Sequence, residues 1–368
     1  MSDDTGIRIR DAEEVEAIAD AIVDVEPVDP SEVVHAVASG GDTLFTWDYT
    51  KGRYPGLEKL YEKAKRSQWN AETDIDWSIE VDPEHVLSFL TDGRGEGIPR
   101  SIREHPDLPM RTWGDREWVA FGVESLHWRL SQFLHGEQGA LVCTAKIVET
   151  VPWIDAKYYA ATQVMDEARH VEVFGRYLQT KLDHTYPINP HLRMLLDDII
   201  RDDRWDITYL GMQIMVEGLA LAAFGFMHQF CDDPLLKQIL RYVMADEARH
   251  VAFGVLSLRE FYAELTEAEI RERQEFAFDA ALRMRDRLLQ QEVWERMGVD
   301  VRRTMKALLE VPPEDMVFQQ MLFSKIVPNC KKLGLLDAGS GWLRARFTEI
   351  GVIHYEDHTD DFDDALVA

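Results

Sequence analysis

The sequence predicts an all-α protein: a four-helix bundle with one long crossover, extended by helical segments at its N- and C-terminal ends. Four stretches place apolar residues at helical spacing, and each is longer than an average helix. Short breaks divide these stretches into two pairs, and a longer connection joins the pairs. The hexapeptide Asp-Glu-Ala-Arg-His-Val occurs at 166–171 and again at 246–251, a displacement of 80 residues, which indicates that the second pair repeats the first.

The N-terminal region, residues 1–117, is predicted to be a mixed and partly helical extension. Helical spacing occurs at about 12–25 and again at 57–69, whereas 39–55 is rich in turn residues. Glycine, proline and charged residues dominate from 92 to 113, which favours an irregular connection before the core begins.

The core region, residues 118–265, contains the four long stretches. Val-Pro-Trp at 151–153 separates the first two, and Asp-Asp-Pro at 232–234 separates the last two, because Asp and Pro commonly mark where one helix ends and the next begins. The longer connection between the pairs contains residues 184–191. We therefore expect helices at about 118–150, 156–182, 206–230 and 235–264.

The C-terminal region, residues 266–368, is predicted to be a second helical extension with an acidic tail. A charged helical stretch continues to about residue 309. Residues 354–364 are acidic enough that we expect them to be solvated or disordered.

The composition argues against several classes of partner. With 67 acidic and 40 basic residues, the formal net charge of -27 would repel nucleic acid and anionic membranes. The N-terminus has no basic stretch followed by an apolar one, and we expect no run long enough to span a bilayer. These features predict a cytoplasmic protein that binds neither nucleic acid nor membrane.

The three cysteines predict that electrons must come from another protein. They lie far apart without a CxxC pair, so this chain alone builds neither a disulfide framework nor an iron–sulfur site. Neither a GxGxxG strand–helix unit nor a GxxxxGK[ST] motif occurs, which gives no sign of a nucleotide or flavin cofactor.

Six residues have the types and spacing of ligands to two metal ions. Each repeated hexapeptide contains Glu-x-x-His, and a Glu lies thirty residues before each of these motifs. A Glu and a His three residues apart share one helix face with about 4.5 Å of rise between them, so both can reach one ion. The six predicted ligands are Glu137, Glu167, His170, Glu217, Glu247 and His250.

Helix lengths predict that these residues meet. About 15 residues separate Glu137 from the turn at Pro152, and about 15 more return the chain to Glu167. At about 1.5 Å per residue, both glutamates reach the same height in the bundle. The second pair repeats this arrangement around a turn near Asp233.

The ligand set predicts the kind of metal. Four carboxylates neutralise two divalent cations, whereas the same four carboxylates buried without metal would be very costly. Glu-rich ligation with one imidazole per metal suits iron or manganese better than a thiolate site would. We expect two iron ions, with an Mn/Fe pair as the alternative.

Further residues of the hexapeptides predict how the ligand histidines are oriented. Asp166 and Asp246 each lie four residues before a ligand His, one turn away on the same face, where a carboxylate can accept the ring N–H. Arg169 and Arg249 can pair with these aspartates and keep them ionised.

The paired Asp-Glu-x-Arg-His motifs and their upstream glutamates resemble those of the ferritin-like di-iron carboxylate proteins, specifically the O2-activating branch. That branch includes the bacterial multicomponent monooxygenase hydroxylases, the soluble acyl-carrier-protein desaturases, the arylamine N-oxygenases and the ribonucleotide reductase small subunits. The resemblance covers roughly residues 120–265 and implies a ferritin-like bundle. It also implies that Glu137, Glu167 and His170 serve one iron and the other three ligands the second, with some carboxylates bridging.

The sequence departs from each subfamily at one position or more. Phe174 stands where the reductase small subunits carry a radical-bearing Tyr. Ala220 and Leu221 follow the third Glu, where the monooxygenases and desaturases usually have a Thr. Val243 and Met244 occupy the turn where the N-oxygenases place a seventh ligand, a His. The resemblance therefore selects the superfamily and none of these subfamilies.

Other residues near the predicted ligands have lesser predicted roles. Glu124-x-x-His127 also matches the ligand spacing, but no Asp precedes it and no copy lies 80 residues on, so we assign it a structural role. Five residues within one or two turns of the lone glutamates are candidates to line a substrate pocket, with core packing as the alternative for each. They are Phe133, Thr144, Gln213, Ile214 and Phe224.

The resemblance implies an O2-dependent oxygenase, N-oxygenation included, that acts on a small-molecule or acyl substrate and takes electrons from an external reductase or ferredoxin. An acyl desaturase is the alternative with related chemistry, and an iron-oxidising or iron-storage protein is the alternative from another class. A storage subunit needs little beyond four helices, whereas this chain has about 120 residues before them and about 100 after them. We expect a homodimer, but the sequence does not name the substrate or the donor.

Overall fold

The predicted all-α fold is confirmed. The computed structural model describes residues 11–50, 52–87, 98–311 and 316–359, and within these ranges the regular structure is helical throughout. Buried apolar side chains form one continuous core that reaches from Ala19 to Val352.

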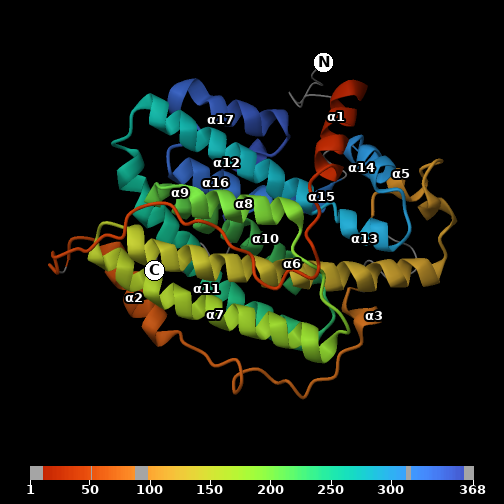
Figure 1. The fold of residues 1–368 in the computed structure, drawn as a ribbon, viewed down its shortest axis with the longest axis horizontal. Helices are drawn as coiled ribbons and strands as arrows, with labels where there is room; N and C mark the ends of the chain where they lie inside the picture. Colours follow the sequence, from red (N-terminus) through yellow and green to blue (C-terminus); the bar gives the residue numbers. More distant parts are fainter. Residues whose placement is uncertain (1–10, 51, 88–97, 312–315, 360–368) are drawn as a thin grey trace.

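Two pairs of long helices form the bundle (Figure 1). The first two of these helices pack closely along their length, the last two also pack together, and the second helix of each pair contacts that of the other. The third position is a continuous succession of three helical segments. The elements are α6 (Asp115–Thr150), α7 (Ile154–Lys181), α9 (Trp205–Tyr209), η2 (Leu210–Val216), α10 (Glu217–Phe230) and α11 (Pro234–Tyr262).

The turn between α10 and α11 shows why the predicted break lies where it does. Asp233 caps α11: its carboxylate accepts hydrogen bonds from the backbone N–H groups of Leu235, at 2.9 Å, and Leu236, at 3.2 Å. Pro234 occupies the first helical position, where its missing N–H costs nothing. The hydroxyl of Tyr177 on α7 also donates to Asp233, which ties the turn to the other helix pair.

The crossover contains a helix that the sequence analysis did not foresee. α8 (Pro190–Arg201) begins just after Asn189, whose side chain accepts from the N–H of His191 at 3.0 Å. Asn followed by Pro is a start signal for a helix, so the sequence contained the necessary information.

The third bundle position includes a stretch of π-helix, η2, directly before Glu217. The N–H of Glu217 donates to the carbonyl of Met212, five residues earlier rather than four. The whole segment Trp205–Phe230 is long and apolar enough to cross a membrane, so the expectation that no run reaches that length was wrong. Because 83% of its apolar window is buried inside the protein, its composition is also that of a central core helix.

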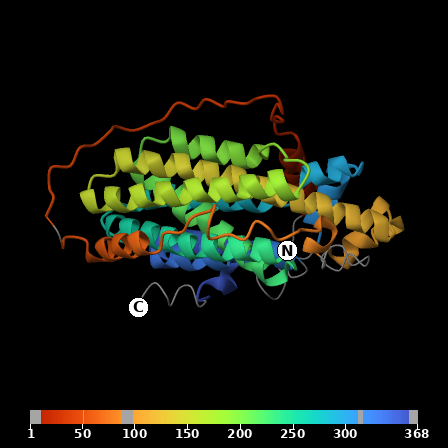
Figure 2. The same ribbon diagram turned by 90° about the horizontal axis from the view of Figure 1, so that it is seen from below.

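The N-terminal extension wraps around the bundle (Figure 2). After its first helix, an extended segment runs along the outside of the molecule (Figure 2). Its Gly40 N–H donates to Ile200 on α8, and its Leu44 N–H donates to Glu149 on α6. The second helix of the extension packs on both α7 and α11. The elements are α1 (Ala12–Val23), α2 (Pro55–Arg66), α3 (Pro83–Val86), α5 (Arg100–Arg103) and η1 (Pro109–Thr112).

The irregular connection predicted at 92–113 is therefore partly helical, because α5 and η1 lie within it. Its residues 92–97 lie outside the described ranges. The predicted helix at 57–69 ends earlier, at Arg66 of α2, so residues 67–69 lie beyond the helix.

The C-terminal extension covers another side. The stretch predicted as one charged helix to residue 309 forms three helices, with left-handed backbone at Gln290 and Gly298 between them. The elements are α12 (Glu267–Arg287), α13 (Gln291–Arg296), α14 (Val301–Leu309), α15 (Val317–Met321), α16 (Phe323–Lys332), α17 (Ala338–Glu349) and η4 (Ile353–Tyr355).

The start of the acidic tail is attached to this extension. Glu356 forms ion pairs with Lys331, at 3.2 Å, and with Arg344, at 2.8 Å, so this part of the tail is ordered, while residues 357–359 are exposed, as the expected solvation implies. Residues 360–364 of that predicted segment lie outside the described ranges. Since α12 packs on α8 and η2, and α16 packs on α10, the extension encloses the second helix pair.

The close packing of α11 against η2 generates a stability prediction. A Cβ at Gly254 would lie 2.7 Å from the Cβ of Gln213 and 3.1 Å from the side chain of Ile214. We expect Gly254→Ala to lower the free energy of unfolding by about 1–3 kcal/mol, because the helices must move apart. Gly225→Ala on α10, where a Cβ meets nothing within 4 Å, is the control and should be neutral or stabilising by up to about 1 kcal/mol. Urea unfolding measures both, and equal stability of the two variants would contradict this packing.

Candidate metal centre

All six predicted ligands meet in the interior of the bundle. Each helix contributes at the same height, as the helix lengths predicted, and no ligand side chain is more than 5% exposed. α6 supplies Glu137, α7 supplies Glu167 and His170, α10 begins with Glu217, and α11 supplies Glu247 and His250.

The first group of ligand atoms surrounds His170. Its Nδ1 lies 3.1 Å from Glu137, 3.3 Å from Glu167 and 3.1 Å from Glu247. The ligand atoms of these four residues all lie within 4.8 Å of one another, a spacing that could hold a metal ion.

The second group surrounds His250 and shares a residue with the first. Glu167, Glu217 and His250 also have ligand atoms within 4.8 Å of one another. Nδ1 of His250 lies 3.0 Å from Glu167 and 3.6 Å from Glu247. Glu167 and Glu247 therefore each face both imidazoles, which is the position of bridging ligands between two ions.

The position of Glu247 fits the bridging carboxylates that the resemblance implied. Its carboxylate lies 3.1 Å from His170 on α7 and 3.6 Å from His250 on its own helix. The reason is geometric: a residue at the contact between α7 and α11 lies as close to the opposite helix as to its own.

Unpartnered atoms in the cluster fit two cations. Among the described residues, both carboxylate oxygens of Glu247, one oxygen each of Glu167 and Glu217, and Nδ1 of His250 are buried without a hydrogen-bond partner. Buried polar atoms of this kind are costly unless something pairs with them. Metal ions placed between these oxygens and nitrogens would pair with all of them.

Charge repulsion among the buried glutamates also indicates that the cluster binds metal ions. Burial, together with the charge of Glu247, raises the pKa of Glu137 well above its ordinary value. Burial and the charges of Glu167 and Glu247 do the same to the pKa of Glu217. These carboxylates lack sufficient positive charge around them, and two divalent ions would supply it.

The imidazoles partly compensate for this repulsion. Burial alone would lower the pKa of His170, but Glu137, Asp246 and Glu167 raise it well above its ordinary value. Glu167 and Glu247 have the same effect on the pKa of His250. Metal ligation requires neutral imidazole, so bound ions would replace these protons.

The aspartates orient the histidines, but across the helix pair rather than within one helix. Nε2 of His170 on α7 donates to Asp246 on α11 at 3.2 Å, and Nε2 of His250 on α11 donates to Asp166 on α7 at 3.3 Å. The expectation that each Asp serves the His of its own helix was therefore wrong. The result is that Nδ1 of each ring faces the glutamates.

The two arginines lie where the sequence predicted and also cross between the helices. Arg169 forms an ion pair with Asp166 of its own helix and approaches Asp246 at 3.6 Å. Arg249 pairs with Asp246 and approaches Asp166 at 3.4 Å. The two hexapeptides thus form one buried network.

Two further residues contact this network from just after α2, Gln68 and Trp69, and the sequence analysis assigned them no role at the site. The indole N–H of Trp69 donates to Asp246 at 2.7 Å, and the ring stacks near His170. Gln68 donates to Asp166 at 3.2 Å and accepts from Arg169 at 2.6 Å. The N-terminal extension is therefore part of the site.

Gln163 was missed altogether. It is fully buried one turn before Glu167, and its amide donates to Glu167 and to Glu217, both at 2.9 Å. A polar residue one turn before a ligand, on the buried face of α7, was the available signal.

The predicted pocket residues are all buried among other side chains. Phe133 packs edge-on against Phe224 at 4.7 Å, and both rings contact Phe174. The amide of Gln213 contacts the hydroxyl of Thr144 at 3.4 Å. Ile214 is fully buried on η2. A role for these residues in substrate binding stays a prediction.

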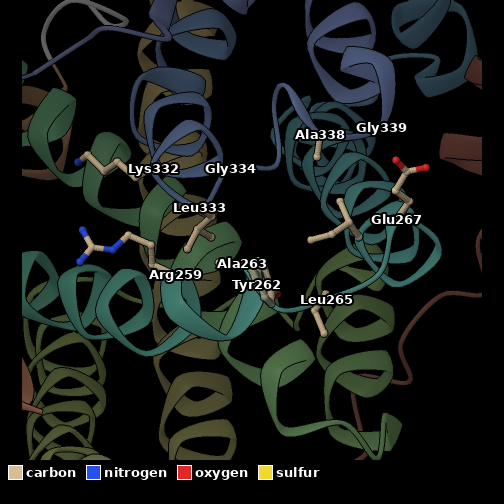
Figure 3. A pocket seen from close by; sticks show the side chains of 11 residues that line it. Arg259, Tyr262, Ala263, Leu265, Glu267, Lys332, Leu333, Gly334, Ala338 and Gly339 are labelled. Atoms are coloured by element: carbon tan, nitrogen blue, oxygen red, sulfur yellow. The ribbon is translucent and has the colours of Figure 1, made fainter. Parts of the chain in front are cut away.

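A cavity of about 490 Å³ lies elsewhere, between the end of α11, the start of α12 and the α16–α17 connection (Figure 3). Arg259 and Tyr262 line it, about two and a half helical turns and more beyond His250. Neither the six ligands nor the five predicted pocket residues line this cavity.

The comparisons with known proteins are limited. No protein-family model and no curated protein matches the chain. Similar solved structures include an R2-like ligand-binding oxidase with aerobically reconstituted metal cofactor after photoconversion, at 20% identity and a TM-score of 0.48, covering 77% of this chain and 94% of that chain. Another is the R2-like ligand-binding oxidase with aerobically reconstituted Mn/Fe cofactor, at 19% identity and a TM-score of 0.48, covering 77% and 93%. Similarity at this level assigns no activity to the chain.

The shared position of Glu167 and Glu247 generates a prediction about metal binding. The double variant Glu167→Ala, Glu247→Ala removes both residues that face the two imidazoles. We expect it to bind two fewer transition-metal ions per chain than the unchanged protein, as measured by elemental analysis after anaerobic Fe(II) loading. Glu172→Ala, an exposed residue on α7, is the matched control and should bind as many ions as the unchanged protein. Equal metal content in the double variant would show that the cluster is not a metal site.

The aspartates that orient the histidines of the opposite helix generate a prediction about metal affinity. Asp166→Asn and Asp246→Asn remove the charge that orients His250 and His170, respectively. Each change should leave the helical content intact but weaken metal affinity by about 10–100-fold, because the imidazole loses its orienting acceptor. Asp279→Asn, exposed on α12, is the control. Competition with a chromophoric chelator measures the affinity, and unchanged values in both variants would mean that the aspartates do not support the ligands.

Proposed function

We propose that this protein is an O2-dependent oxidoreductase with a dimetal cofactor, most simply two iron ions, with an Mn/Fe pair as the alternative. The observation that carries the proposal is the overlap of two ligand groups through Glu167, with Glu247 facing both imidazoles. Two bridging positions require two neighbouring ions, and ligation by glutamate and imidazole suits iron and manganese.

A redox-active metal pair would supply the electrons and the oxidising power for the reaction with O2. The protein's part is to hold the ions and their surroundings. Asp246 and Asp166 fix the ring orientation of His170 and His250. The amide of Gln163 donates to both Glu167 and Glu217 and so fixes the distance between the two carboxylates. This support keeps the ligands in place while the charge of the metals changes.

We propose oxygenation of an organic substrate, N-oxygenation included, as the reaction. The α2 segment on one side and α12 and α16 on the other enclose the ligand helices. Such enclosure supports an enzyme that retains its metals and keeps water away from the reacting atoms. An acyl desaturase would use the same centre and is the alternative within this chemistry.

We propose that electrons come from an external reductase or ferredoxin. Cys143, Cys231 and Cys330 are all buried and free in the structure. A buried thiol with a raised pKa is not reactive toward oxidants or metals: burial raises the pKa of Cys231 to about 11 and that of Cys330 to about 12. These residues therefore do not supply an electron carrier.

A limited reaction with O2 distinguishes this proposal from iron storage. The reduced, iron-loaded protein is given O2 with a large excess of Fe(II) and no organic substrate. We expect about one O2 to be consumed per metal pair, with further turnover only when a reductant and an organic substrate are added. An oxygen electrode and iron analysis of the desalted protein measure the result. If hundreds of irons per chain are oxidised and retained, the protein stores iron and the oxygenase proposal fails.

A further inference from the structure

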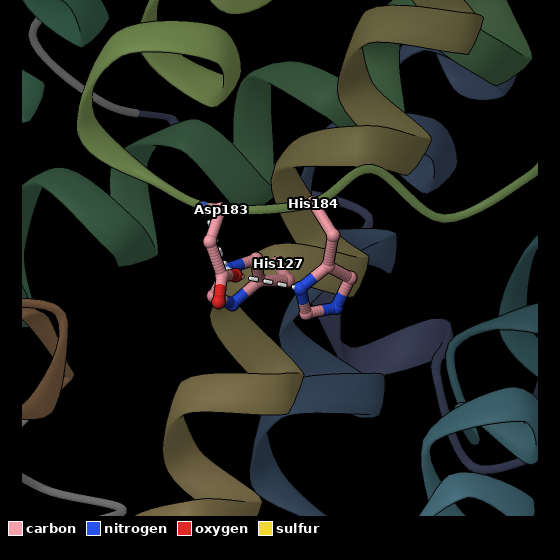
Figure 4. A group of neighbouring side chains, drawn as sticks. All are labelled: His127, Asp183 and His184. Carbon is pink, nitrogen blue, oxygen red and sulfur yellow. Dashed lines mark hydrogen bonds and ion pairs between the residues drawn. The ribbon is translucent and has the colours of Figure 1, made fainter.

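A second group of side chains that could hold a metal ion lies against the N-terminal half of α6 (Figure 4). His127 on α6 lies ten residues, or about 15 Å of helix rise, before Glu137. Asp183 and His184 follow the end of α7 and face it. The ligand atoms of these three residues lie within 4.8 Å of one another.

The three side chains converge on one point. Oδ1 of Asp183 lies 2.7 Å from Nε2 of His127 and 2.7 Å from Nδ1 of His184. The two imidazole rings are stacked, with centroids 4.0 Å apart and planes 10° from parallel. One nitrogen of each ring therefore lies next to the same carboxylate oxygen, and Nε2 of His127 also accepts from the backbone N–H of Asp183 at 3.5 Å.

The other nitrogen of each ring already has an acceptor. Nδ1 of His127 donates to the backbone carbonyl of Val123 at 2.8 Å. Nε2 of His184 donates to the carboxylate of Glu124 at 3.2 Å. In a neutral imidazole the proton is then held on this outer nitrogen, and the lone pair lies on the nitrogen that faces Asp183. Outer acceptors that fix the ring in this way are typical of histidines that bind metal.

Glu124 is itself held in place. It accepts from the hydroxyl of Tyr186 at 2.5 Å and from Nε of Arg296 at 2.9 Å. The Glu124-x-x-His127 pair, which the sequence analysis assigned a structural role, thus contributes one ring and the acceptor for the other.

With the protons on the outer nitrogens, two nitrogen lone pairs and a carboxylate oxygen lie close together. The structure gives Nε2 of His127 one long hydrogen bond, from the backbone N–H of Asp183 at 3.5 Å. A divalent cation between the three atoms would pair with all of them. It would also leave the outer hydrogen bonds in place.

We propose that His127, Asp183 and His184 bind a single divalent transition-metal ion, with zinc as the natural occupant. Two imidazoles and one carboxylate are a common zinc ligand set, and a water molecule would complete a tetrahedron. His127 is buried, whereas the side chain of Asp183 is 86% exposed, so the ion would enter from solvent. The ion fastens the start of the crossover to α6. This site is independent of the dimetal centre and of its proposed reaction.

The test uses the full chain, with the dimetal centre loaded with iron before zinc is added. Iron and zinc are measured by elemental analysis after removal of free metal. The unchanged protein should hold one more zinc per chain than His184→Ala or Asp183→Ala, at equal iron content. His85→Ala is the matched control, because His85 pairs with Asp82 at 2.8 Å on an exposed surface without a second imidazole, and it should keep the zinc.

Two further measurements distinguish ligation from a simple hydrogen-bonded contact. Co2+ in place of zinc should give the visible absorption of a tetrahedral site in the unchanged protein and not in His184→Ala. Glu124→Gln should weaken zinc binding by about 10–100-fold while the three ligands remain. If the unchanged protein, His184→Ala and Asp183→Ala all hold the same amount of zinc, the proposal is wrong and the three residues are only hydrogen-bonded. Should His184→Ala fail to fold, the exposed Asp183→Ala variant decides.

Discussion

The burial of four glutamates at one level of a helix bundle is the constraint on which the rest of the structure depends. An ionised carboxylate inside a protein costs several kcal/mol unless positive charge lies beside it, and here four lie together. The raised pKa values of Glu137 and Glu217 show that the neighbouring imidazoles and arginines do not compensate fully. Two divalent ions complete the balance, so the fold and the cofactor support each other.

The surrounding network turns this local requirement into contacts between distant segments. Asp166 and Asp246 bind across α7 and α11, and Trp69 joins them from the N-terminal extension. A shift of α7 or α11 would therefore move ligands of both groups. The extensions that enclose the bundle keep this network dry, which strengthens each of its charged hydrogen bonds.

Features that depend on spacing along one helix could be predicted from the sequence, and features that depend on how helices turn toward each other could not. The 80-residue repeat identified Glu137 and Glu217 as partners of the two Glu-x-x-His motifs. The fixed rise per residue of a helix then predicted that the glutamates of each helix pair lie at the same height. The crossing of the aspartates depends on the rotation of α7 against α11, which no local pattern contains. The π-helical η2 likewise requires its tertiary neighbours. By contrast, Asn189 before a proline did signal α8, and that signal was overlooked.

Anomalous diffraction from crystals of the Fe(II)-loaded protein, collected on both sides of the iron absorption edge, tests the central claim most directly. We expect two iron peaks about 3.5–4 Å apart within the bundle, with Glu167 and Glu247 both between them. A single peak, or two peaks that do not share a carboxylate, would contradict it.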